Sequence, residues 1–234
     1  MISGGGRKII EIIPTCVPHD VRDLVQSAEK ARSFTQKLHI DIDDGIMTAA
    51  MTWPYTKPGT FADVTLNPIA GTEACIHLMT KDPRAIGTAL SFAGAVSVVA
   101  HIESFASPTD ARDAISVWQK SGAIEVGYAI LLDTPLEHLK PVVDICEVLQ
   151  VMSVASIGLQ GATFDARAIE RVRELHQRYP NRIIAVDGGV NENNIGELVK
   201  AGAIRFGVGA AIMKDPNPID AYTRLKAAAE NALK

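Results

Sequence analysis

The two residues best suited to take part in chemistry are His39 and Asp41, which lie two apart in the segment LHIDIDDG. Strand side chains alternate between two faces, so both would point the same way if this segment is a strand. An imidazole and a carboxylate on one face are suitable ligands for a divalent transition metal. We interpret the pair as half of a metal site.

Two further short apolar runs also end in possible metal ligands. The run CIHLM contains His77, and the run IIAVDGG contains Asp187 just before Gly188 and Gly189. Taken singly, an Asp at a strand end often caps a helix, and a lone His is often a satisfied core residue. Two carboxylates brought together, however, repel each other unless a cation or a shared proton relieves them. The combination favours metal-assisted chemistry.

The two last apolar runs are each followed by a loop that could bind an anion. After Asp187 and the glycine pair, a helix is expected to open near 191–194, which would direct backbone N–H groups and a positive helix end at the loop. Gly209, Ala210 and Ala211 follow the final run in the same way. Tight strand-to-helix turns are the alternative for either loop alone. Together the loops favour a phosphorylated small molecule as substrate.

Eight short apolar runs recur at the spacing that a strand plus a helix requires. Eight β/α repeats favour a closed parallel barrel over an open sheet, so we predict an α/β fold, a (β/α)8 TIM barrel, as a single domain over residues 1–234. The predicted strands are Ile9–Ile13, Leu38–Ile42, Ala74–Leu78, Val96–His101, Ile124–Ile130, Val148–Val154, Ile183–Val186 and Ile204–Val208. Helices are expected over Asp20–Thr35, Asp110–Ser121, Asp165–Tyr179 and Asn193–Ala201, the last capped by Gly202.

One interval departs from this rhythm. Between Asp44 and Glu73, prolines and glycines exclude a long helix. An irregular loop is therefore expected to replace most of the helix after the second strand. Because it begins at the end of the barrel where active sites lie, it is a candidate lid or oligomer contact. A shortened helix with a plain surface loop is the alternative.

The composition limits the possible partners and location. The chain has 234 residues, 47% of them hydrophobic, and a formal net charge of -4 without clustered Lys and Arg. This pattern argues against a general nucleic-acid binder. No segment approaches the roughly 20 apolar residues of a membrane span. Three cysteines without metal-type spacing argue against a disulfide framework. We predict a cytoplasmic protein with neither nucleic-acid nor membrane partners.

Along nearly its whole length the chain resembles the ribulose-phosphate 3-epimerase family of metal-dependent barrel enzymes. The family's motifs occur in the same order. They are Pro14-Thr15, HIDIDDG at His39–Gly45, HLM at His77–Met79, HIE at His101–Glu103, Thr134-Pro135, MSV at Met152–Val154 and DGG at Asp187–Gly189.

The resemblance implies one divalent ion, Zn, Fe, Mn or Co, held by His39, Asp41, His77 and Asp187. It implies that Asp41 and Asp187 also act as catalytic acid and base. The implied reaction inverts the third carbon of a ketose phosphate, D-ribulose 5-phosphate to D-xylulose 5-phosphate, through a metal-stabilised enediolate. Such families often form homo-oligomers. The substrate-binding residues implied are Thr15, Met79, Met152, Gly158, Gly161, Gly188, Gly189, Gly209 and Ala210.

Several positions depart from the family pattern. Asp43 stands where the family has methionine, and Thr15 and Ala210 stand where it has serine. The glycine-bearing loop at 156–164, a plausible flap over the substrate, is also altered. Another ketose phosphate, such as allulose 6-phosphate, therefore stays open as substrate.

Two other functions stay open beside the epimerase. The altered positions leave room for a noncatalytic sugar-phosphate-binding barrel. A related barrel group that decarboxylates or condenses phosphosugars uses an Asp-x-Lys-x-x-Asp array, and HIDIDDG lacks that lysine.

His101 and Glu103 share one strand face, and we interpret them as a helix cap or as hydrogen-bonding residues of the barrel rim.

Overall fold

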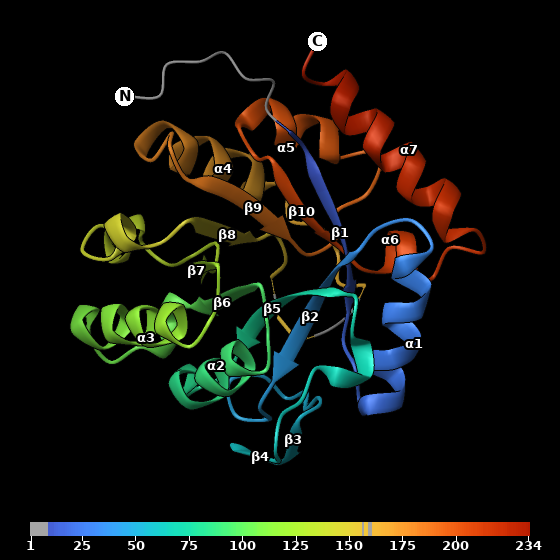
Figure 1. Cartoon of the computed structure of the whole chain (residues 1–234). Helices are drawn as coiled ribbons and strands as arrows, with labels where there is room; N and C mark the ends of the chain where they lie inside the picture. Colours follow the sequence, from blue (N-terminus) through green and yellow to red (C-terminus); the bar gives the residue numbers. More distant parts are fainter. Residues whose placement is uncertain (1–8, 156, 159–160) are drawn as a thin grey trace.

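The computed structural model describes residues 9–155, 157–158 and 161–234, and its centre is a closed barrel of eight strands (Figure 1). Neighbouring strands all run parallel, in the order β1-β10-β9-β8-β7-β6-β5-β2. The predicted TIM-barrel fold class is confirmed. The barrel strands are β1 Glu11–Cys16, β2 Lys37–Asp43, β5 Glu73–Met79, β6 Ser97–His101, β7 Glu125–Ile130, β8 Val148–Met152, β9 Ile183–Asp187 and β10 Arg205–Val208.

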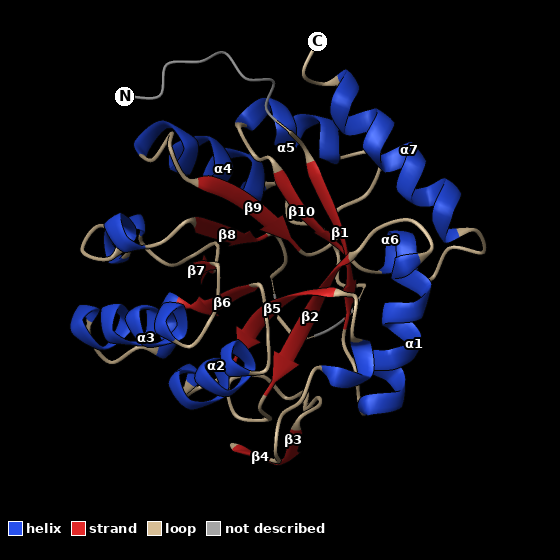
Figure 2. Ribbon diagram, in the orientation of Figure 1, coloured by secondary structure: helices blue, strands red, loops and turns tan. Residues whose placement is uncertain are grey.

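Helices surround the barrel on its outer side (Figure 2). Their apolar faces pack on outward-facing strand residues such as Ile40 and Ile42, and both of these are fully buried. Gly202 ends one helix in the left-handed conformation, as predicted. Within the described ranges, no helix combines the length and apolar character that crossing a bilayer demands. The helices are α1 Val21–Arg32, α2 Pro83–Phe92, α3 Pro108–Lys120, α4 Arg167–Arg178, α5 Ile195–Ala201, α6 Ala210–Met213 and α7 Pro218–Asn231.

The first strand lies further along the chain than the apolar run predicts. Ile9 is 78% exposed, and β1 instead runs from Glu11 through Pro14 to Cys16. Its partners explain the shift, because Pro14 pairs with Val208 of β10 and the next residue pairs with His39 of β2. Thr15 therefore lies on a strand of the barrel.

The interval after β2 contains no α-helix, as predicted. It forms a two-stranded antiparallel sheet of β3 Tyr55–Lys57 and β4 Thr60–Phe61, followed by the 3₁₀ turn η1 Asn67–Ile69. Asp44 anchors its start, since one carboxylate oxygen accepts the N–H groups of Ile46 and Met47 and the other accepts that of Lys81 at 2.7 Å. The proposed roles as a lid or oligomer contact stay predictions.

A second interval without an α-helix lies between β7 and β8. It contains only the 3₁₀ turns η3 Leu136–His138 and η4 Val143–Ile145. Pro135 and Pro141 restrict helix formation there, because proline lacks the N–H that a continuing helix needs. Elsewhere in the barrel wall, η2 Ile102–Ser104 follows β6 directly.

The inside of the barrel is layered. Its middle is apolar and contains Val99, Ala129, Val148 and Ala185, which pack together as a separate cluster. Below them, Arg205 of β10 bonds to Glu11 of β1 at 2.7 Å and to Glu125 of β7 at 2.6 Å. Because β10 and β7 are not neighbours in the barrel, the second bond crosses its interior. The layer above the apolar one holds the polar residues described next.

Candidate active site

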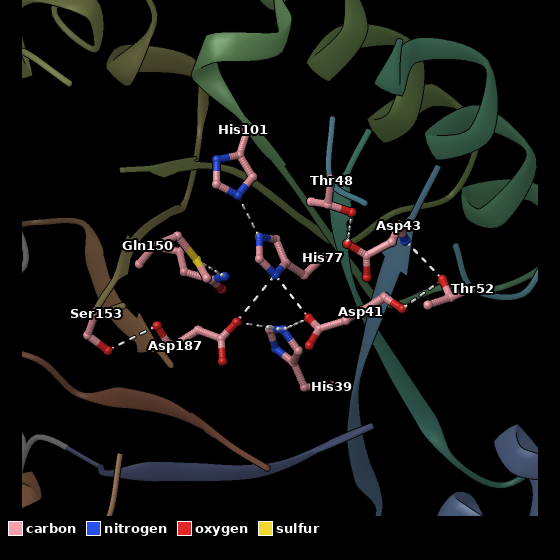
Figure 3. Close-up of polar contacts among 11 residues, drawn as sticks. His39, Asp41, Asp43, Thr48, Thr52, His77, His101, Gln150, Ser153 and Asp187 are labelled. Carbon is pink, nitrogen blue, oxygen red and sulfur yellow. Dashed lines mark hydrogen bonds and ion pairs between the residues drawn. The ribbon is translucent and has the colours of Figure 1, made fainter. Parts of the chain in front are cut away.

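Four polar side chains meet inside the barrel, near the carboxyl ends of three strands (Figure 3). His39 and Asp41 share the inward face of β2, since the intervening Ile40 packs outward. Asp41 pairs in register with His77 of β5, so these two side chains lie side by side. Asp187 ends β9 and reaches in from across the barrel. We refer to these four residues as the His/Asp cluster.

Nitrogen and oxygen atoms alternate in the His/Asp cluster. His77 Nδ1 lies 3.0 Å from Asp41 Oδ1 and 3.3 Å from Asp187 Oδ2. His39 Nε2 lies 3.1 Å and 3.7 Å from the same two oxygens. All four residues are buried. Each carboxylate therefore faces two imidazole nitrogens, and the four atoms enclose a small common centre.

The electrostatics of the cluster favour a positive charge at that centre. Burial alone would raise the pKa of Asp41, but hydrogen bonds from His39 and His77 outweigh it and hold this pKa at about 2. Burial would lower the pKa of His77, but its bonds to Asp187 and Asp41 raise it to about 10. In the metal-free protein, a proton on His77 therefore supplies the positive charge that the carboxylates require.

A divalent ion fits the same atoms. One ligand atom from each of the four residues lies within 4.8 Å of every other. Two imidazoles with two carboxylates form a mixed donor set that suits Zn, Fe, Mn or Co and does not distinguish among them. The predicted four ligands are thus brought together, and their binding of an ion stays a prediction.

A cavity of about 400 Å³ opens beside the cluster, with Asp41 and Asp187 in its lining. The structure places all nine predicted substrate-binding residues in that lining as well. Three residues of the predicted flap, 156, 159 and 160, lie outside the described residues. The remaining lining is largely apolar, as expected for a small-molecule site. The residues concerned are Thr15, Met79, Met152, Gly158, Gly161, Gly188, Gly189, Gly209 and Ala210.

The loop after β9 needs its glycines. Gly188 and Gly189 both have positive φ, 110° and 64°, which L side chains rarely adopt. A Cβ on Gly189 would also lie 2.7 Å from the backbone nitrogen of Phe164. The loop therefore brings bare backbone to the cavity wall, beside the turn formed by Asn191 and Asn194 before α5.

Asp43 shares the β2 face of His39 and Asp41 but does not join the His/Asp cluster. Its Oδ1 accepts the hydroxyl of Thr48 at 2.6 Å, and its Oδ2 has no hydrogen-bond partner among the described residues. Burial, followed by the nearby charge of Asp41, raises the pKa of Asp43 to about 6. Gly158 covers this pair, since a Cβ there would lie 2.8 Å from Thr48 Cβ.

His101 and Glu103 extend the site more than the sequence interpretation allows. His101 Nε2 lies 3.2 Å from His77 Nε2, and His101 Nδ1 lies 3.2 Å from Glu103 Oε2 (Figure 3). Glu103 also accepts the hydroxyl of Thr134, so the expected rim hydrogen bonds are present. The contact with His77 was not predicted. The HIE spacing was the available signal, since parity places His101 on the same inner face as the cluster.

Comparison with known proteins gives consistent relatives. The chain is 28% identical over 196 residues to ribulose-phosphate 3-epimerase of Synechocystis sp., covering 81% of this chain and 80% of that protein. It is 27% identical over 227 residues to the cytoplasmic isoform of the same enzyme from Oryza sativa subsp. japonica, covering 95% of each chain. The Escherichia coli K12 enzyme is 32% identical over 146 residues, 61% of this chain and 63% of that protein.

Solved structures share the fold at low sequence identity. 3-Hexulose-6-phosphate synthase from Salmonella typhimurium superposes with a TM-score of 0.68 at 13% identity, covering 95% of this chain and 100% of that one. Orotidine 5'-monophosphate decarboxylase from Sulfolobus solfataricus gives 0.59 at 12% identity, covering 96% and 100%. These two similarities support the barrel architecture alone.

The family assignment rests on the full length of the barrel. A family model described as "Ribulose-phosphate 3 epimerase family" matches residues 11–213, from the start of β1 to the end of α6. This confirms both the predicted resemblance and the predicted class of enzyme, an isomerase. The chain belongs to the ribulose-phosphate 3-epimerase family.

Proposed function

We propose that this protein inverts the third carbon of a ketose phosphate, with D-ribulose 5-phosphate and D-xylulose 5-phosphate as its substrate pair. One observation carries the proposal. Asp41 and Asp187 reach the same cavity from β2 and β9 and face the same two imidazole nitrogens. Relatives named as this epimerase support the choice of substrate.

Two carboxylates on different strands suit an inversion at carbon. One takes the proton from the third carbon, and the other delivers a proton to the opposite face. β2 and β9 are separated in the barrel by β1 and β10, so Asp41 and Asp187 approach the cavity from different directions. Because the carboxylates share the same imidazole neighbours, their protonation is a property of the whole cluster.

The His/Asp cluster holds the divalent ion in this proposal, through His39, Asp41, His77 and Asp187. When bound, such an ion supplies positive charge that stabilises the enediolate anion. His39 and His77 contact both carboxylates and so help to fix their positions beside the cavity. Met79 and Met152 contribute apolar, adaptable surface to the cavity wall.

The phosphate of the substrate is assigned to the loops after β9 and β10. Gly188, Gly189, Gly209 and Ala210 line the cavity with backbone and small side chains. The Ala210 position keeps its backbone N–H, although the family's hydroxyl is missing there. Phosphate groups are commonly bound by these two loops in barrels of this type.

Two alternatives differ from this proposal in specific ways. A decarboxylase or synthase of the related barrel group would need a lysine in its catalytic array, and the described cavity lining contains none. A noncatalytic sugar-phosphate-binding barrel would not need two acidic groups facing each other across the cavity. Bringing two carboxylates together in a buried site costs desolvation energy, which favours a function that uses both.

The test is proton NMR in heavy water of D-ribulose 5-phosphate, D-xylulose 5-phosphate and allulose 6-phosphate, each incubated with the purified protein. We expect deuterium to enter the third carbon of the first two as they interconvert. Faster exchange of allulose 6-phosphate would change the substrate assignment. Tight phosphate binding without any exchange would contradict the epimerase and favour the binding protein.

The remaining expectations concern location and assembly. We infer a cytoplasmic homo-oligomer, by analogy with a relative named as a cytoplasmic isoform and with the family. Ile46 is 55% exposed and Met51 39% exposed on the interval after β2, which is apolar surface suited to a subunit contact. Light scattering of wild type and of Ile46→Asp tests the assembly, since the variant should dissociate.

A further inference from the structure

A chain of polar contacts runs from the His/Asp cluster to the rim of the barrel. It links His77 Nε2 to His101 Nε2 and His101 Nδ1 to Glu103 Oε2, each at 3.2 Å. Glu103 Oε1 accepts the N–H of Leu131 at 2.9 Å and the hydroxyl of Thr134 at 2.5 Å. The side chains of His77 and His101 are fully buried, so solvent does not supply other partners.

We propose that Glu103, acting through His101, is a positioning residue that holds His77 in the tautomer with its proton on Nε2, which leaves Nδ1 free to bind the ion. This inference rests on the proposed metal site. It assigns a role to two residues that contact neither the ion nor the cavity directly.

The direction of the hydrogen bonds follows from the acceptor at the end of the chain. An ionised carboxylate only accepts, so the proton between His101 and Glu103 must be on His101 Nδ1. A neutral His101 then presents a lone pair at Nε2, and the facing Nε2 of His77 must carry the proton that fills this 3.2 Å contact. The Nδ1 atom of His77 is left facing the two aspartates.

The opposite direction requires a protonated Glu103. Its hydroxyl would donate to His101 Nδ1, His101 would donate to His77, and His77 Nδ1 would carry a proton that blocks an ion. Two donors already satisfy the other oxygen of Glu103. Burial alone would raise the pKa of Glu103, but the bond from His101 and the further donors hold it at about 2, which favours the ionised form.

The two directions differ in an observable that needs no substitution. Long-range ¹H–¹⁵N NMR spectra of wild-type protein labelled with ¹⁵N-histidine and loaded with Zn²⁺ distinguish the protonated ring nitrogens. We expect the His101 proton on Nδ1 and the His77 proton on Nε2. A His101 proton on Nε2 would overturn the inference, whatever the turnover of the enzyme.

Variants then test whether this tautomer matters for the ion. The amide of Gln can donate as well as accept a hydrogen bond, so Glu103→Gln removes the preference for one tautomer of His101 and His77. We expect the Kd of this variant for Zn²⁺ to rise about 10–100-fold in a chelator competition. Glu147→Gln is the matched control, because Glu147 also accepts a backbone N–H, that of Val126, near the opposite end of the barrel. The control should bind Zn²⁺ like the wild type.

The outcomes separate this inference from the proposed function. If the wild type, Glu103→Gln and Glu147→Gln all bind Zn²⁺ with the same Kd, the positioning role alone is overturned. A wild-type protein that does not bind Zn²⁺ would overturn the metal site and the inference with it. If Glu103→Gln fails to fold, the tautomers of the wild-type protein still decide the question.

Discussion

Asp43 and Thr48 share a buried hydrogen bond of 2.6 Å directly beneath Gly158 of the loop after β8. The bond turns one oxygen of the Asp43 carboxylate away from the His/Asp cluster, and the second oxygen has no described partner. At this position the family pattern has methionine, so an acid stands here in place of an apolar group, and burial disfavours its ionised form. That exchange has a measurable cost.

Asp43→Asn should change how stability depends on pH. The pKa of Asp43 is about 6 in the folded protein, above its ordinary value of 3.8, so the folded state binds the proton more tightly. Its stabilising effect is therefore complete below about pH 3.8 and is lost as the pH rises to about 6, at a cost of about 3 kcal/mol. Urea unfolding of both metal-free proteins from pH 4 to 7 should show a difference that grows with pH. A constant difference would contradict the buried acid.

Asp41→Asn and Asp187→Asn should each strongly impair inversion but preserve the fold. Each variant keeps one carboxylate, so each should still exchange deuterium into one of the two epimers, and the two variants should label opposite ones. We expect turnover to fall by roughly 10²–10⁴-fold, the usual contribution of a general acid or base. The measurement is NMR in heavy water with circular dichroism as the folding control. Exchange of both epimers by either variant would refute the assignment of two separate bases.

Gly207→Ala should impair turnover with little loss of stability. A Cβ at Gly207 would lie 2.9 Å from Asp187 Oδ1, the movable end of a side chain, so the carboxylate would shift rather than the backbone. A displacement of a catalytic group by about 1 Å can lower the rate about 100-fold. Gly196→Ala is the matched control, because its Cβ would meet only ordinary contact at 3.7 Å. Equal turnover in the two variants would contradict the role of Asp187.

Zn²⁺ binding should release a proton at pH 8. The aspartates raise the pKa of His77 to about 10, so its Nδ1 is protonated in the metal-free protein and must lose that proton to bind an ion. Affinity should therefore increase as the pH rises from about 7 to 9. Calorimetry in buffers with different ionisation enthalpies measures the released proton. An enthalpy independent of the buffer would argue against His77 as a ligand.

Arg205→Met should lower stability and leave turnover unchanged. Arg205 bonds to Glu11 and Glu125, and removing it leaves the partly buried Glu125 without its ion-pair partner, whereas Glu11 keeps Lys37, so we expect a cost of about 3 kcal/mol. Arg112→Met removes an exposed ion pair with Asp144 and should cost much less. Thermal unfolding and steady-state kinetics of both variants test the expectation. A loss of turnover in Arg205→Met would contradict this expectation and show that the two ends of the barrel are coupled.

Much of the fold follows from local rules in the sequence. Alternation in β2 predicts which residues face inward, and because Ile40 packs outward, His39 and Asp41 must share the other face. Parallel strands in register then bring Asp41 beside His77. The start of β1 was predicted too early, because the apolar Ile9 continues the hydrophobic pattern although pairing with β10 begins later.

The features of the site that the sequence did not predict depend on contacts between distant segments. Alternation places Asp43 on the face of Asp41, but its separation from the cluster depends on Thr48, which lies in an irregular interval. The contact of His101 with His77 is made between β5 and β6, and only the orientation of two rings determines it. Single-sequence patterns carry periodicity and do not carry such orientations.

The apolar layer of Val99, Ala129, Val148 and Ala185 insulates the charged base of the barrel from the chemistry at its open end. Substitutions around Arg205 and Glu125 can therefore be selected for heat tolerance without disturbing proton transfer. In the same way, a new specificity can be engineered among the loops of the open end at little risk to the scaffold. Stability and specificity can therefore evolve separately, because this apolar layer lies between the parts of the barrel that determine them.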